Sequence, residues 1–173
     1  VLGRQMEHAY CPVPDFFDEG IGARLTTADI GEDPIQVGIT TITPRKVNHT
    51  PGISTFGFRL DSDGQSLAYI PDVEYLNETH QRPALQLAEG VDLLIHDAHH
   101  TSAEYDSQRG CGHCSDAAAV ELARKADVGK LILFHHRPDH GDDTIDDVVS
   151  HYSGDEVDVE AASERAEYVL DSR

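Results

Sequence analysis

Histidine and aspartate residues stand repeatedly where apolar stretches of the sequence end. The chain has eleven histidines among its 173 residues. A side chain at the end of a strand is held rigidly, while the loop beyond it stays open to a ligand. Neutral imidazole and carboxylate are the groups by which proteins bind zinc or manganese, so we expect several strand ends to converge on a metal. The residues in such positions are His49, Asp72, His96, Asp97, His135 and His136.

The remaining histidines give a weaker signal, because a lone histidine near a strand is usually a surface or core residue with ordinary hydrogen bonds. We expect His99 and His100 to be loop residues outside the site, and we expect no role in it for His8, His80 and His151. The prediction of a site therefore depends on the joint placement of several residues.

The first part of the chain is predicted to form antiparallel β-structure. Alternating and β-branched runs indicate short strands, and the turn at residues 61–64 contains an Asp-Gly step, which tolerates positive φ and is typical of hairpins. The predicted strands are residues 23–30, 35–43, 55–60 and 66–70.

The second part is predicted to alternate buried strands with helices, which implies a partly parallel sheet covered by helices and an α/β fold class. In one of these helices Ser115 is the expected N-cap, and Ala118, Leu122 and Ala126 share a face. The predicted strands are residues 91–96 and 130–134, and the predicted helices are residues 82–88, 115–126 and 144–151.

The composition restricts the class of partner. Thirty-two acidic residues against thirteen basic ones give a formal charge of −19, which disfavours nonspecific binding to nucleic acid or to anionic membranes. No apolar run reaches the roughly 20 residues of a membrane-spanning helix, and we expect a cytoplasmic protein. Aspartate exceeds glutamate and lysine is scarce, which fits either a halophile or ordinary acidic solubility.

Cys111 and Cys114 form a C-x-x-C spacing, which by itself indicates a redox pair or half of a zinc site. No second C-x-x-C occurs in the sequence to complete a four-cysteine zinc site. The role of this pair stays open at the level of the residues.

Five stretches of the sequence occur in an order that resembles one family. They are Asn48-His49-Thr50-Pro51-Gly52 running into residues 55–60, Ala68-Tyr69-Ile70-Pro71-Asp72, GVDLLIHDA at residues 90–98, Gly112-His113-Cys114-Ser115, and GKLILFHHRPDH at residues 129–140. Together they cover roughly residues 35–145. They resemble the C-terminal part of the metallo-β-lactamase-fold hydrolases, in the branch near ribonuclease Z and bacterial phosphodiesterases.

The resemblance implies a fold and a set of metal ligands. The chain, residues 1–173, would be a single domain forming the C-terminal half of an αββα sandwich, with a mixed sheet and helices on one face. His49 matches a ligand of the first metal, Asp72 the aspartate that bridges two metals, and His135 a ligand of the second. The implied cofactors are two divalent ions, zinc in the first place and manganese as the alternative.

The resemblance also implies catalytic residues. His113 matches a histidine near the leaving group, where it can protonate a phosphate oxygen, and Asp97 stands where an acid orients that histidine. His140 matches a contact to the substrate or to a metal ligand. Cys114 occupies a position usually held by serine or threonine, which favours a structural role for it.

One family hallmark is missing from the sequence. No His-x-His-x-Asp-His run, which supplies most ligands of both metals, occurs in the chain. Because the sequence begins with Val1 and matches the family from its middle onward, we expect either a piece of a longer protein or a stand-alone half. Such a half would need its N-terminal counterpart or a second copy of itself.

The expected function is metal-dependent hydrolysis of a phosphodiester, either a small molecule or an RNA 3′ end, with this chain supplying part of the site. Two alternatives remain open at this stage. One is a lactone, thioester or ester hydrolase of the same fold. The other is a non-catalytic half-domain that serves as a binding or assembly module, which the missing run favours.

Overall fold

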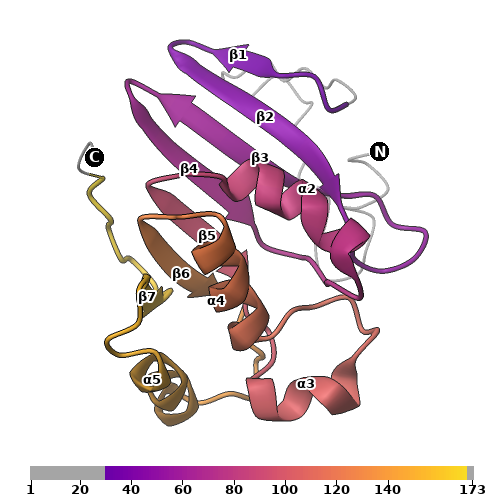
Figure 1. Ribbon diagram of the computed structural model, residues 1–173, viewed down its shortest axis with the longest axis vertical. Coiled ribbons are helices and arrows are strands. Elements are labelled where there is room, and N and C mark those ends of the chain that lie inside the picture. The colour runs from indigo at the N-terminus through magenta and orange to yellow at the C-terminus, as the bar shows by residue number, and fades with distance from the viewer. Residues whose placement is uncertain (1–29, 171–173) are drawn as a thin grey trace, which may run out of the picture. The chain divides into compact units, whose positions relative to one another are not determined.

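The computed structural model describes residues 30–170, in which seven strands form one sheet in the order of the sequence (Figure 1). The strands are β1 (Ile35–Val37), β2 (Thr40–Val47), β3 (Thr55–Ser62), β4 (Gln65–Ile70), β5 (Leu93–Asp97), β6 (Lys130–Phe134) and β7 (Asp158–Ala161).

The sheet changes from antiparallel to parallel at β4. Strands β1 to β4 pair antiparallel, and the β3–β4 hairpin turns at Asp63 and Gly64, both of which have positive φ. Strands β4 to β7 pair parallel. Since two antiparallel steps restore the direction of the chain, β2 runs parallel to β4, β5 and β6. The carboxyl ends of these four strands therefore meet at one edge of the sheet.

Four helices connect or follow the strands in the described part of the chain, and their starts carry the expected capping chemistry. The side chain of Asn77 accepts a hydrogen bond from the His80 amide, and that of Ser115 accepts one from the Ala118 amide, which satisfies amides that lack a partner within the helix. The helices are α2 (Glu78–Ala88), α3 (Ser102–Gln108), α4 (Asp116–Lys125) and α5 (Asp142–His151).

The core lies between the sheet and two of these helices. Helix α2 packs on β2, β3 and β4, and helix α4 packs on β5 and β6, on the same face of the sheet (Figure 1). Gly57 of β3 leaves room for α2, because a Cβ there would stand 2.8 Å from Leu87 Cδ1. Fully buried residues of this layer include Ile70, Leu94, Leu122, Leu131 and Leu133.

These features confirm the predicted fold class, a mixed α/β sheet with helices on one face. Ser115 is the N-cap as predicted, and the strand at Lys130–Phe134 has the predicted bounds. Within residues 30–170, no helix combines the length and the apolar composition that crossing a bilayer requires.

Several predicted elements were wrong in their bounds. The single strand expected at residues 35–43 is two strands, because Gly38 adopts a positive φ of 61° and turns the chain between β1 and β2. Helix α2 begins four residues before the predicted start, where Asn77 caps it. Helix α3 and strand β7 were not predicted. The strand expected at residues 23–30 falls almost wholly outside the described residues, as does His8.

Candidate metal centre and active site

The edge where the four parallel strands end carries most of the residues singled out from the sequence. His49 follows β2, Asp72 follows β4, Asp97 ends β5 and His135 follows β6. His113 reaches the same edge from the loop before α4. The predicted convergence of strand ends is therefore present in the structure.

Two overlapping groups of metal-ligating side chains form at this edge. Ligand atoms of His49, Asp72 and His113 all lie within 4.8 Å of one another, and so do ligand atoms of His99, His113 and His135. Nε2 of His135 stands 3.5 Å from Oδ1 of Asp72, which joins the two groups. The three predicted metal ligands are thus neighbours of the predicted leaving-group histidine.

The hydrogen bonds of these imidazoles suit metal ligation. Nδ1 of His49 lies 2.7 Å from the carbonyl of Gly112, Nδ1 of His113 lies 2.7 Å from Asp97 Oδ2, and Nδ1 of His99 lies 2.9 Å from the carbonyl of His135. Each acceptor requires a proton on Nδ1, which leaves a lone pair on Nε2. A histidine that binds a metal ordinarily donates its other N–H to an oxygen in this way. The donor set therefore fits divalent ions of the zinc type.

Asp97 is the buried carboxylate behind the site. Its side chain is fully buried and accepts hydrogen bonds from the Val73 amide, the His99 amide and the imidazole of His113. The pKa of His113 is raised above its ordinary value, mainly by the hydrogen bond to Asp97. Burial lowers this pKa, but by less than the hydrogen bond raises it. His113 therefore binds a proton more readily than a histidine without this partner does.

Glu74 is a second buried carboxylate, and sequence reasoning missed it. One of its oxygens accepts from the Gly110 amide at 2.6 Å and from the Tyr105 hydroxyl at 3.1 Å, and the other accepts from the Gly112 amide at 2.8 Å. Its backbone also exchanges two hydrogen bonds with Asn48, the residue before His49. Glu74 thus ties together the two loops that carry His49 and His113.

His99 was expected to be an ordinary loop residue, and the structure places it inside the histidine cluster. Its ring stacks on that of His113, with centroids 4.4 Å apart, and lies 5.2 Å from that of His135. Burial lowers the pKa of His99, so its neutral form, the one that binds metals, is favoured. The signal in the sequence was its position, two residues beyond the strand-ending Asp97.

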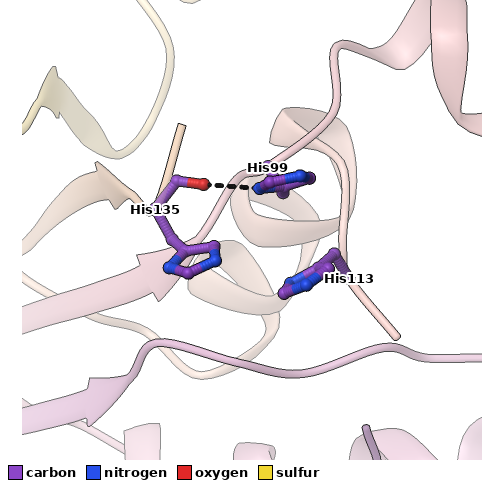
Figure 2. Close-up of side chains that lie close together, drawn as sticks. All are labelled: His99, His113 and His135. Atoms are coloured by element: carbon purple, nitrogen blue, oxygen red, sulfur yellow. Dashed lines mark hydrogen bonds between the residues drawn. The ribbon is translucent and has the colours of Figure 1, made fainter. Parts of the chain in front are cut away.

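His135 has a backbone conformation that is costly for a side chain other than glycine. Its φ is 61°, in the left-handed region that costs roughly 1–2 kcal/mol. Such strain persists only where surrounding contacts impose it. Here the conformation turns the His135 carbonyl to His99 while its ring faces His113 (Figure 2).

His140 and the two cysteines lie outside both ligand groups. Nε2 of His140 is 3.0 Å from Glu104, a residue of α3, and its role toward substrate or a ligand stays a prediction. Cys111 and Cys114 are free thiols. Cys111 Sγ lies 3.0 Å from His100 Nε2, and Cys114 is buried in the core cluster.

His96 and His136 were singled out at strand ends, and neither belongs to a ligand group in the described part of the chain. His96 is fully buried, with Nε2 2.6 Å from the Tyr75 hydroxyl and Nδ1 2.7 Å from the Asp97 carbonyl. Both ring nitrogens are therefore engaged in the interior. Burial lowers the pKa of both histidines.

Known proteins resemble this chain in sequence. A family model described as "Beta-lactamase superfamily domain" matches residues 8–136. Ribonuclease BN of Escherichia coli is 46% identical over 52 residues, which make up 30% of this chain and 17% of that protein.

Solved structures share the fold. The metallo-beta-lactamase fold protein YhfI of Bacillus subtilis has a TM-score of 0.63 and 22% identity, over 79% of this chain and 52% of that one. The short form of human tRNase Z has a TM-score of 0.60 and 18% identity, over 79% of this chain and 46% of that one. The chain spans about half the length of these two structures.

Proposed function

Because the chain belongs to the beta-lactamase superfamily, we propose that it contributes to a metal-dependent hydrolase of phosphodiester bonds. The observation that carries this proposal is the Asp97–His113 pair beside the His49 and Asp72 ligand atoms. The similarity to a ribonuclease in sequence, and to a tRNase in fold, supports a phosphodiester substrate.

His49, Asp72 and His135 would hold two divalent ions, zinc in the first place, with manganese as the alternative. When bound, such ions polarise the phosphoryl group and make water nucleophilic at neutral pH. The sequence contains no His-x-His-x-Asp-His run, so the remaining ligands would come from another segment of the protein or from a second copy of this chain.

His113 would act as the general acid. Its Nδ1 is bonded to Asp97, so Nε2 is the nitrogen left to carry a proton to the departing oxygen. Asp97 keeps the imidazole in this orientation and stabilises its charged form. An alkoxide leaving group needs such a proton, because an alkoxide is a strong base.

The substrate would be a small phosphodiester or the 3′ end of an RNA. A formal charge of −19 repels an extended polyanion, so within this chain we favour a small phosphodiester. An RNA substrate would require basic residues from the rest of the protein.

The test compares two leaving groups in the complete gene product loaded with zinc. His113→Gln should slow hydrolysis of a dinucleotide, whose leaving group is an alkoxide, by about 100-fold or more. The same substitution should slow hydrolysis of the nitrophenyl ester of that nucleotide far less, because nitrophenolate leaves without a proton. His151→Gln, an exposed histidine of α5, is the matched control and should leave both rates unchanged.

Two results would refute the proposal. Hydrolysis of lactones or thioesters without hydrolysis of either phosphodiester would assign the site to carboxylic substrates. A zinc-loaded protein that hydrolyses none of these compounds would be a binding or assembly module.

A further inference from the structure

We propose that His99, His113 and His135 form a zinc-binding site of their own, which this chain can fill without ligands from any other segment. The site is centred on His99, to which the family resemblance assigns no role. It shares His135 with the ligand set of the proposed hydrolase, His49, Asp72 and His135, and combines it with His99 and His113 in place of the other two.

The three imidazoles come from three separate segments and face one another (Figure 2). His99 follows β5, His113 precedes α4 and His135 follows β6. The three ring centroids form a triangle, in which His113 lies 4.4 Å from His99 and 4.9 Å from His135, and His99 lies 5.2 Å from His135. Their ligand atoms lie within 4.8 Å of one another.

These separations are within reach of a tetrahedral zinc ion. Zn–N bonds of about 2.0–2.1 Å place two tetrahedral ligands about 3.3 Å apart. The atoms would therefore close by at most about 1.5 Å, a movement that small rotations of the side chains supply. Three imidazoles leave a fourth position for water, and a site of this kind favours zinc, cobalt or nickel over magnesium or calcium.

The surroundings hold two of the three ligands in the form that binds a metal. His99 donates Nδ1–H to the His135 carbonyl, and His113 donates Nδ1–H to Asp97. Asp97 also accepts the His99 amide at 3.0 Å, so one buried carboxylate orients both residues. Oxygen acceptors behind the ligands fix the tautomer and make the imidazole more basic toward the ion.

The backbone conformation of His135 links two of the three ligands. A φ of 61° is costly for histidine, and the contact that accompanies it here is the His99 hydrogen bond to the His135 carbonyl. The same residue supplies a ligand and orients another ligand. The strained conformation thus assembles two of the three imidazoles.

An ion in this site occupies Nε2 of His113. If His113 is the general acid, as the proposed function requires, zinc binding here and proton donation exclude each other. Occupation of the site by excess zinc would then inhibit hydrolysis, a consequence that rests on the proposed function. Binding itself does not rest on that function.

The test is a titration of the 173-residue chain with Co²⁺, followed by the visible absorption of the ion and by competition with Zn²⁺. We expect one ion per chain, with the intense absorption of four-coordinate cobalt. His99→Gln and His135→Asn should each weaken binding by at least about 100-fold, since even removing an acceptor behind a ligand costs about 10–100-fold. His151→Gln, at an exposed histidine of α5, is the matched control and should leave the affinity unchanged.

The variants separate loss of a ligand from loss of the fold. Asparagine tolerates the left-handed backbone better than most residues, so His135→Asn removes the imidazole with little added strain, and circular dichroism checks each variant. Failure of the wild-type chain to bind cobalt overturns the site, as does a His99→Gln variant that binds cobalt as tightly as the wild-type chain. Neither outcome involves a substrate, so the hydrolase proposal is tested separately.

Discussion

The helix-covered core and the histidine edge of the sheet are held together by different interactions. In the core, Ile70, Leu94 and Leu131 are fully buried between the sheet and helices α2 and α4, where burial of apolar surface supplies the free energy. At the edge, two buried carboxylates, Glu74 and Asp97, accept directional hydrogen bonds from the loops that carry the histidines.

This difference separates stability from site geometry. Apolar contacts in the core are numerous and individually weak, so a substitution there lowers stability while the sheet still sets the direction of the strand ends. A hydrogen bond at the edge fixes one loop, so its loss moves particular imidazoles. Substitutions in the core should therefore change mainly the free energy of unfolding, whereas substitutions at the histidine edge should also change the positions of the imidazoles.

The largest effect on stability is expected from the core. Ile70→Ala removes a side chain that is 0% exposed and should lower the free energy of unfolding by about 2–5 kcal/mol, through lost burial and the cavity left behind. The matched control is Ile39→Ala, at a residue that is 75% exposed, and it should cost less than about 0.5 kcal/mol. Urea denaturation measures both. Equal costs would contradict the described packing.

The next effect is expected at Glu74. Glu74→Ala leaves the amides of Gly110 and Gly112 without their acceptor, and the buried one, that of Gly112, costs about 1–3 kcal/mol when it is unpaired. Unlike Ile70→Ala, this change should also shift the imidazole NMR signals of His49 and His113, whose loops Glu74 joins. Glu74→Gln keeps one acceptor oxygen and should show smaller changes of both kinds. Unmoved imidazole signals in Glu74→Ala would show that the loops do not depend on this carboxylate.

A smaller effect on stability, with a selective effect on geometry, is expected at Gly112. Its φ is 103°, and a Cβ there would stand 2.7 Å from His49 Nδ1. Gly112→Ala should cost about 1–2 kcal/mol for the backbone and should displace His49. Gly110→Ala is the matched control, because its φ is 94° with open space around the Cβ position. It should cost as much stability without moving the His49 signal, and a similar shift in both variants would contradict the contact.

The same contrast explains how far the sequence could predict this molecule. Patterns local to one segment predicted the fold class, the strand at Lys130–Phe134 and the cap at Ser115. The resemblance drawn from five segments is confirmed by the family match over residues 8–136. The predicted strand bounds were wrong where one residue interrupts a local pattern, as the positive φ of Gly38 does between β1 and β2.

The site was predictable only where a residue stands at the end of a strand. The strand ends brought His49, Asp72 and His135 together as expected. Glu74 could not be found in this way, because it contacts Gly110 and Gly112, 36 and 38 positions further along the chain. His99 was missed because its place depends on the conformation of His135. Contacts of this kind are set by tertiary structure and leave no periodic pattern in the sequence.

The smallest effect is expected from an ion pair remote from both regions. Asp155, in the loop between α5 and β7, pairs with Arg124 in the last turn of α4. The hydrogen bonds from Arg124 are the main cause that lowers the pKa of Asp155 from 3.8 to about 2. Because the pKa is lower in the folded chain, the pair stabilises the fold above about pH 4, and this contribution disappears as the pH falls towards 2.

Asp155→Asn should therefore lower the melting temperature slightly at pH 7, and the difference from wild type should shrink between pH 4 and pH 2. Added salt should shrink it as well, because the pair is partly exposed and screened. Asp147→Asn, at an exposed position of α5, removes the same charge without touching the pair. If the two variants follow the same pH profile in calorimetry, the effect is one of net charge, and the Arg124–Asp155 pair contributes nothing of its own.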